Sequence, residues 1–189
     1  METLLGLCIG IGLSAACGFR VFVPLWLLSI AALCGWLTPM QQFAWVAHPM
    51  VCFALAVATL LEIGAYYIPW VDNALDTIAT PAAMLAGTLS TLVVSSGEMS
   101  QFSHWAVALI AGGGTAGLVQ MGSVALRATS TATTAGIANP FIATVEWLAA
   151  LMVSLLSLWL PIITLIVVII LLGYILSKLH LRYKTQPPL

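Results

Sequence analysis

Residues 158–179 of the chain read LWLPIITLIVVIILLGYILSKL and contain a single charged residue, Lys178. A helix crosses the hydrocarbon core of a bilayer with roughly 20 apolar residues, so this stretch is long and apolar enough to span it. The whole chain has the same character, because 62% of its 189 residues are hydrophobic, only 6% are charged and the mean hydropathy is +1.12. A soluble domain carries about 25% charged residues to cover its surface. The composition therefore excludes a soluble domain, a disordered chain and a coiled coil, and it predicts an all-α integral membrane protein.

Further apolar segments precede this stretch, and together they predict about six to seven hydrophobic helices in a single polytopic domain over residues 1–180. Leu4–Cys17 is short for a crossing and rich in glycine, which predicts half of a re-entrant hairpin within residues 4–24. A second re-entrant or broken segment is expected over residues 127–140, where polar and helix-breaking residues interrupt the pattern. The predicted segments are Leu4–Cys17, Phe19–Leu37, Pro49–Ile68, Pro81–Ser96, Ser103–Leu126, Pro140–Ser157 and Leu158–Leu179.

The C-terminal end of the chain is basic, with Lys178, Arg182 and Lys184 close together. Short loops and tails that carry Lys and Arg stay on the cytoplasmic side, so the C-terminus is expected to be cytoplasmic. Residues 181–189 lack an apolar face and are predicted to form a disordered tail.

Composition and cysteine spacing also limit the partners. The net charge of −1 argues against a nucleic-acid partner, which needs a basic face. The four cysteines lie in apolar stretches without C-x-x-C spacing, which predicts small buried side chains and neither a metal site nor a cofactor.

Six charged residues at or within the predicted spans carry the functional information. A charge at the bilayer centre costs about 2.5–3.5 kcal/mol on insertion scales, so such residues usually face a partner or a water-filled cavity. Glu98, by contrast, lies in the polar stretch of residues 95–101 and is expected to be a solvated loop residue. The six are Arg20, Glu62, Asp72, Asp76, Arg127 and Glu146.

Arg20 lies in GLSAACGFRVFVP, residues 12–24, where small residues separate two apolar runs. If these runs form a re-entrant hairpin, Arg20 lies near its tip inside the membrane. The alternative is a tip at the headgroup level, with Arg20 bound to lipid phosphate. Glu62 lies about two turns before the Pro69-Trp70 step. An isolated carboxylate there is expected to be protonated, and one paired to Arg20 or Arg127 is expected to be ionised. The pairing would either belong to a site or be a structural ion pair between helices.

Asp72 and Asp76 lie four residues apart in IPWVDNALDTI, residues 68–78. On a helix this spacing puts both carboxylates on one face. Two like charges repel unless a cation, a proton or an arginine lies between them, which favours a binding role. The alternative is an interfacial helix that Asp72 caps and whose acids are solvated.

The most polar stretch is LRATSTATTAGIANP, residues 126–140, which is followed about two turns later by Glu146. Its hydroxyls, with Arg127, would make an anion cradle if they lie at a helix start. With their oxygens turned inward they would instead line a cation or water path, and the third interpretation is a surface loop. The candidate pathway residues in this stretch are Ser130, Thr131, Thr133, Thr134 and Asn139.

Two short stretches echo each other across the halves of the chain. Residues 16–19, ACGF, and residues 134–137, TAGI, each precede an apolar run with an early proline. Repeated halves with interrupted helices are typical of transporters, so this weak internal repeat points in the same direction as the charges.

The polar blocks at residues 12–24, 68–78 and 126–140 resemble the motif blocks of a family of small bacterial inner-membrane proteins known only as a domain of unknown function. The resemblance covers residues 4–179. It implies a multi-pass protein of the bacterial inner membrane, and it supplies neither a substrate nor a mechanism.

These observations predict a small membrane transporter or channel for an ion or small solute, with the charges and hydroxyls named above along its pathway. Four acids against two arginines suit a proton or cation, either transported or coupled to a solute. The alternatives are translocation of an anionic lipid and a structural or accessory role in which the charges only pair helices. An enzyme is not expected, because no nucleophile-base pair, H-E-x-x-H helix or P-loop is present. Because a chain of this size has few helices to enclose a transport pathway, a homo-oligomer in the bilayer is expected.

Overall fold

The computed structural model describes residues 2–95 and 99–185, which are helical with short connections and contain no strand. Glu98 lies outside the described residues. The all-α prediction is confirmed. The elements are α1 (Glu2–Cys17), α2 (Phe22–Leu33), the 3₁₀ helix η1 (Gln41–Ala47), α3 (Pro49–Ala65), α4 (Pro69–Val94), α5 (Gln101–Val107), the π-helix η2 (Ala108–Gly113), α6 (Gly114–Thr134), α7 (Asn139–Trp159) and α8 (Pro161–Thr185).

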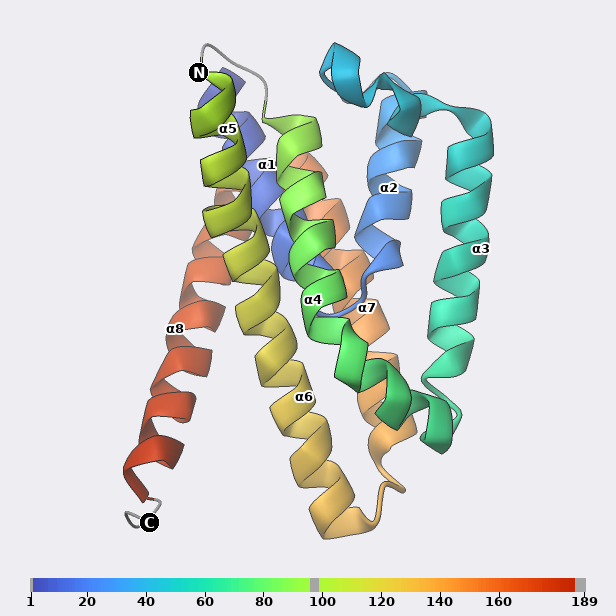
Figure 1. The fold of residues 1–189 in the computed structure, drawn as a ribbon, viewed down its shortest axis with the longest axis vertical. Helices are drawn as coiled ribbons and strands as arrows, with labels where there is room; N and C mark the ends of the chain where they lie inside the picture. The colour runs from blue at the N-terminus through green and yellow to red at the C-terminus, as the bar shows by residue number, and fades with distance from the viewer. Residues whose placement is uncertain (1, 96–98, 186–189) are drawn as a thin grey trace.

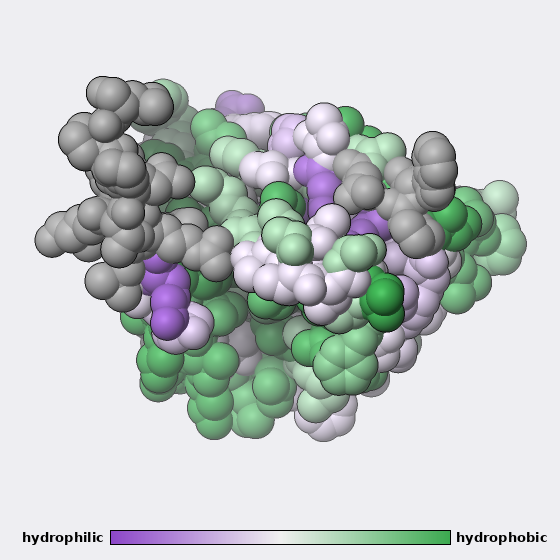
Figure 2. Space-filling view, turned by 90° about the horizontal axis from the view of Figure 1, so that it is seen from below, coloured by the Kyte–Doolittle hydropathy of each residue, from purple (hydrophilic) through white to green (hydrophobic). Residues whose placement is uncertain are grey.

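Four helical segments are long and apolar enough to cross a membrane, and the bent pair of η1 and α3 is a fifth candidate. Many large apolar side chains on the outside of the bundle are exposed, among them Ile162, Ile166 and Ile170 of α8. In the view along the bundle from its lower end, hydrophobic residues dominate the lower side and the far right, and the most hydrophilic residues lie above the centre, at the top and at the left edge (Figure 2). These features indicate a multi-pass membrane protein. The four long segments are Ala74–Val94, Gln101–Thr134, Asn139–Trp159 and Pro161–Lys178.

Helices α1 and α2 form a hairpin that does not cross the bundle. α1 runs from one end to about the middle, and α2 returns to the same end (Figure 1). Both helices are too short to span a bilayer, and α1 packs against α4, α7 and α8. This is the arrangement of the re-entrant hairpin that the sequence predicts at residues 4–24, with irregular backbone enclosed by protein. The turn at residues 18–21 therefore lies about halfway along the bundle.

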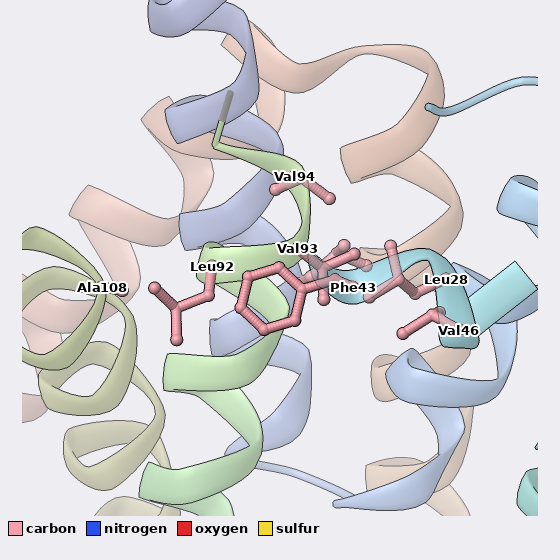
Figure 3. Packing of buried hydrophobic residues seen from close by; sticks show 8 residues of the cluster. Leu28, Phe43, Val46, Leu92, Val93, Val94 and Ala108 are labelled. Atoms are coloured by element: carbon pink, nitrogen blue, oxygen red, sulfur yellow. The ribbon is translucent and has the colours of Figure 1, made fainter. Parts of the chain in front are cut away.

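The open end of the hairpin is held by an apolar cluster. Leu28 of α2 and Phe43 of η1 pack with Leu92 and Val93 of α4 (Figure 3). Ser29 of α2 also donates a hydrogen bond of 2.6 Å to the carbonyl oxygen of Val46 in η1. Through these contacts η1 packs against both α2 and α4, and it holds the end of the hairpin opposite the turn in place.

Helix α6 corrects the prediction of a broken segment over residues 127–140. It continues through Thr134, and only residues 135–138 form a turn, with Ala135 at φ 52° and Gly136 at φ 82°. Thr129 and Thr133 donate to the carbonyl oxygens four residues earlier, at 2.7 and 2.9 Å. Hydroxyls that bond to their own helix do not interrupt it. The turn joins α6 and α7 at one end of the bundle (Figure 1).

Three smaller expectations also differ from the structure. α4 begins well before Pro81 and continues through it, although the sequence predicts a span that starts there. α8 continues to Thr185, so residues 181–185 of the predicted disordered tail are helical, and residues 186–189 lie outside the described part. Cys8 and Cys17 are buried as predicted, whereas Cys34 is exposed and Cys52 is half-buried.

Candidate functional site

Glu62 of α3 holds the turn of the hairpin. Its Oε1 accepts a hydrogen bond of 2.8 Å from the backbone N–H of Val21, and its Oε2 accepts one of 2.9 Å from the N–H of Phe22. The first N–H groups of a helix have no partner within the helix, and the helix dipole favours a negative charge there. Glu62 therefore caps α2 with both oxygens. It takes backbone donors at close range, where the sequence predicts an arginine.

Arg20 lies in the hairpin turn and its side chain is buried in the protein. Its side chain is 1% exposed, its Nη2 lies 2.9 Å from Glu146 Oε2 of α7, and Nη2 also donates to the carbonyl oxygen of Ala143 at 3.3 Å. The guanidinium carbon lies 3.6 Å from the ring centroid of Tyr66, a cation–π arrangement. The alternative of a headgroup-level tip with Arg20 on lipid phosphate is therefore wrong.

Arg127 of α6 gathers three carboxylates. Its Nη1 lies 2.7 Å from Asp72 Oδ1 and 3.0 Å from Asp76 Oδ1, and its Nε lies 3.4 Å from Glu146 Oε1. Its guanidinium carbon is 4.5 Å from the ring centroid of Tyr66. The two aspartates share one face of α4, as their spacing predicts, and Arg127 is the cation that lies against both.

Glu146 links the two arginines. Its two oxygens face different guanidinium groups, and Ser123 of α6 donates a hydrogen bond to its Oε1. The chain of contacts runs from α4 through α6 and α7 to the hairpin turn, and Tyr66 lies against both cations. We call the following six residues the charge cluster: Arg20, Glu62, Asp72, Asp76, Arg127 and Glu146.

The charge cluster is rich in acid for a buried site. It has four carboxylates against two guanidinium groups, which is a net charge of −2 when every carboxylate is ionised. Asp72 and Glu146 are buried, with side chains 2% and 4% exposed, whereas that of Asp76 is 17% exposed. Buried charges are costly unless they are fully compensated. Two negative charges here lack a counter-charge from the cluster itself.

Several polar atoms around the cluster are buried without a hydrogen-bond partner. Among them are Nε and Nη1 of Arg20 and Oδ1 of Asn139. A buried donor or acceptor without a partner costs about 1–3 kcal/mol. Such atoms are where a bound ligand or water is expected. The cluster thus combines excess negative charge with unpaired donors on Arg20.

Besides Arg127, which is part of it, the hydroxyl-rich stretch joins the cluster at one residue, Asn139. Asn139 at the start of α7 donates from Nδ2 to Asp72 Oδ2 at 3.2 Å and to Thr131 Oγ1 at 3.1 Å. Thr133 and Thr134 donate to carbonyl oxygens of α6, and buried Ser130 lies 3.5 Å from Thr134 between their hydroxyl oxygens. These hydroxyls occupy the last turns of α6 and not a helix start. The anion cradle at a helix start is therefore wrong.

Sequence reasoning missed Tyr66 and Ser123. Each lies four residues from a charged residue of its own helical segment, Tyr66 after Glu62 and Ser123 before Arg127. Residues four apart share a helix face, so the same rule that pairs Asp72 with Asp76 points to both. The four-residue spacing from Glu62 and Arg127 could therefore have identified Tyr66 and Ser123 from the sequence.

The chain belongs to the family described as a domain of unknown function, DUF4126, whose family model matches residues 7–180. No curated protein and no solved structure matches the chain. The match agrees with the resemblance carried by the three polar blocks, and all three blocks supply residues that meet Glu62 and Glu146 in the charge cluster. The family description assigns no activity, so function has to be argued from the cluster.

Proposed function

We propose that this protein is a small membrane transporter or channel that moves an ion or small solute, and that protons bound by the charge cluster drive or accompany the movement. The observation that carries the proposal is the convergence of six charged residues from the hairpin turn, α3, α4, α6 and α7. Intramembrane ionisable residues that face a bundle interior commonly mark ion or proton pathways. The excess of two carboxylates gives the cluster a chemical reason to take up positive charge.

A change in the charge of the cluster has to come from protons on its carboxylates and not from its arginines. A guanidinium group keeps its proton under all physiological conditions, so only the carboxylates can change charge. Asp76 is the best candidate to exchange a proton, because its side chain is 17% exposed while Asp72 is 2% exposed. Protonation of Asp76 would also loosen its ion pair with Arg127, which links proton uptake to the contacts that hold the cluster together.

The helix arrangement supports transport as well. Interrupted helices whose ends meet near the bilayer midplane form the sites of many secondary transporters. Here the N-terminal end of α2 lies about halfway along the bundle and is capped by Glu62 (Figure 1). The hairpin turn is bound by two acids, Glu62 on its backbone and Glu146 on Arg20, and under this proposal it is the element that would move when the nearby proton site changes charge.

Three further statements belong to the same proposal. We place the protein in the bacterial inner membrane, on the family resemblance, and its C-terminus in the cytoplasm, because Lys178, Arg182 and Lys184 follow one another there. We expect transport and not catalysis. We also expect a homo-oligomer, and native mass measurements from mild detergent that give only a monomer would contradict this last point.

The first experiment measures proton binding directly. Infrared difference spectra between acidic and neutral pH report the C=O stretch of protonated carboxyl groups in the purified protein. Asp76→Asn should remove one titrating band, and Asp76→Glu should keep it at a shifted position. A spectrum that is unchanged in Asp76→Asn would refute Asp76 as a proton-binding group.

The second experiment measures transport in liposomes with a pH-sensitive dye inside. Wild-type protein should dissipate an imposed pH gradient faster than protein-free liposomes, alone or on addition of a solute from a metabolite panel. Asp76→Asn should abolish the difference while it purifies as a folded protein. If no condition distinguishes wild type from empty liposomes, the transport proposal fails. If Asp76→Asn fails to fold while Asp76→Glu folds and no transport occurs, the structural alternative is favoured.

A further inference from the structure

A second candidate site lies beside the charge cluster, in a partly open cavity of about 600 Å³ between α6, α7 and α8. Its walls are apolar, with Leu126 from α6, Val145 and Ala149 from α7, and Leu171 and Ile175 from α8. This volume lies in the range of about 300–1,000 Å³ that is typical of small-molecule sites. Of the charge cluster only Glu146 lines this cavity, and the proposed transport function gives no role to its apolar walls.

The cavity is elongated along the helices. Its lining runs on α7 from Phe141 to Ala149 and on α8 from Leu171 to Lys178, which at about 1.5 Å per residue is roughly 10–12 Å. One leaflet of the hydrocarbon core is about 15 Å thick, half of the 30 Å total. In this half of the bundle α6 and α8 diverge toward the end where α8 finishes (Figure 1). The cavity therefore has the length and direction of a lipid chain within one leaflet.

The two ends of the cavity differ in chemistry. The outer end carries Lys178, whose Nζ lies 5.5 Å from the ring centroid of Tyr174. Ser123 and Glu146, which are hydrogen-bonded to each other, lie about midway along the cavity, and its inner end is apolar, with Val119, Ala149 and Leu171. An apolar channel with an ammonium group at its mouth suits an amphipathic anion. An organic cation would meet Lys178 first, and a small soluble anion would leave the apolar walls without a partner.

We propose that the cavity binds one anionic phospholipid, with its phosphate at Lys178 and one acyl chain between α6, α7 and α8. Lys178 lies near the end of the last apolar span, at the depth of the headgroups when Pro161–Lys178 crosses the bilayer. The side of the cavity that faces the bilayer includes Leu126, Phe141 and Val145, which are exposed and give a chain lateral access. A bound chain would reach toward Glu146 and exclude water from that side of the charge cluster.

The test uses the full chain, purified and delipidated in dodecyl maltoside, with binding counted by native mass spectrometry. Dioleoyl phosphatidylglycerol and dioleoyl phosphatidylcholine are titrated separately. The wild type should bind one phosphatidylglycerol more tightly than phosphatidylcholine. A basic residue near a membrane surface contributes about 1 kcal/mol, so Lys178→Gln should weaken phosphatidylglycerol binding about fivefold, and Lys178→Arg should retain it.

Filling the cavity tests the chain-binding part. Ala149→Phe places a ring among the lining residues and should abolish binding of both lipids. Ile170→Phe is the matched control, because Ile170 of α8 is exposed and does not line the cavity. If Ala149→Phe does not fold, Val145→Trp at the open side serves instead.

The proposal would be overturned if the wild type bound the two lipids equally. It would also be overturned if the cavity-filling variant bound lipid as tightly as the wild type. These outcomes are independent of proton binding at Asp76, so the two proposals can fail separately.

Discussion

Replacing Glu62 by alanine should destabilise the folded protein by about 3–4 kcal/mol. The carboxylate accepts two backbone hydrogen bonds, from Val21 at 2.8 Å and from Phe22 at 2.9 Å. A hydrogen bond to a charged group contributes about 1.5–3 kcal/mol, so two contribute about 3–6 kcal/mol. We take the lower part of this range because the two bonds are partly buried. The variant would leave both N–H groups of the hairpin turn without their acceptor, because no other side-chain oxygen among the described residues bonds them.

A graded series separates the cap from other roles of the side chain. Glu62→Gln keeps one acceptor oxygen and should lose about half of the effect, roughly 2 kcal/mol. Thr59→Val is the matched control on the same helix. The Thr59 hydroxyl is buried without a hydrogen-bond partner, so its replacement by a methyl group of similar shape should be neutral or slightly stabilising.

The measurement is equilibrium unfolding in mixed micelles, followed by tryptophan fluorescence as the fraction of dodecyl sulfate rises. The free energy of unfolding is compared among wild type, the two Glu62 variants and Thr59→Val. A Glu62→Ala protein within 1 kcal/mol of wild type would refute the capping argument. So would a Thr59→Val protein that loses as much as Glu62→Ala.

Two other sites give stability predictions, the first measured by recovery of folded protein and the second in the same unfolding assay. Arg127→Met removes the cation that three carboxylates share, and loss of one partner of a buried ion pair costs about 3–5 kcal/mol, so little folded protein should be recovered by size exclusion. Wild-type recovery of this variant would contradict the ion-pair geometry. Gly112→Ala should cost about 1–3 kcal/mol, because the new methyl group would meet Thr91 and the backbone of Gly87. Gly114→Ala has open space around the new methyl group and should gain up to about 1 kcal/mol, and equal effects at the two glycines would refute the packing argument.

The helices that the sequence predicted best are long apolar segments, for which the bilayer environment by itself favours a helix. Leu158–Leu179 corresponds to α8 and Pro49–Ile68 to α3, because a long apolar run in a bilayer has few alternatives to a helix. The hairpin was also predictable. Leu4–Cys17 is too short to cross, so it has to turn back inside the protein.

The errors arose where local chemistry competes with helix continuation. Residues 127–134 have the composition of a loop, yet Thr129 and Thr133 satisfy their hydroxyls within α6. Pro81 looks like a helix start, yet α4 runs through it. In both cases the surrounding helices decide whether the segment stays helical, and a single sequence does not contain that information. Propensity is a weak guide when tertiary packing opposes it.

For the site, the sequence identified the members but not the pairing. All six charged residues were found from the cost of burying charge, and the structure brings them together. The partners depend on how the helices pack. Glu62 contacts backbone N–H groups, and Arg20 reaches Glu146 on a helix more than a hundred residues away in sequence.

The pairing also bears on how proton binding would act. Arg20, Val21 and Phe22 are consecutive, so the guanidinium that Glu146 holds and the two N–H groups that Glu62 holds belong to one turn of backbone. Under the proposed function, a proton on either carboxylate weakens one of the two attachments of this turn and leaves the other in place. A ligand or proton shifts a conformational equilibrium only through such differential contacts. Under the proposed function these contacts would couple the charge state of the cluster to the position of the hairpin, whereas in the structural alternative the same contacts would only hold the turn in place.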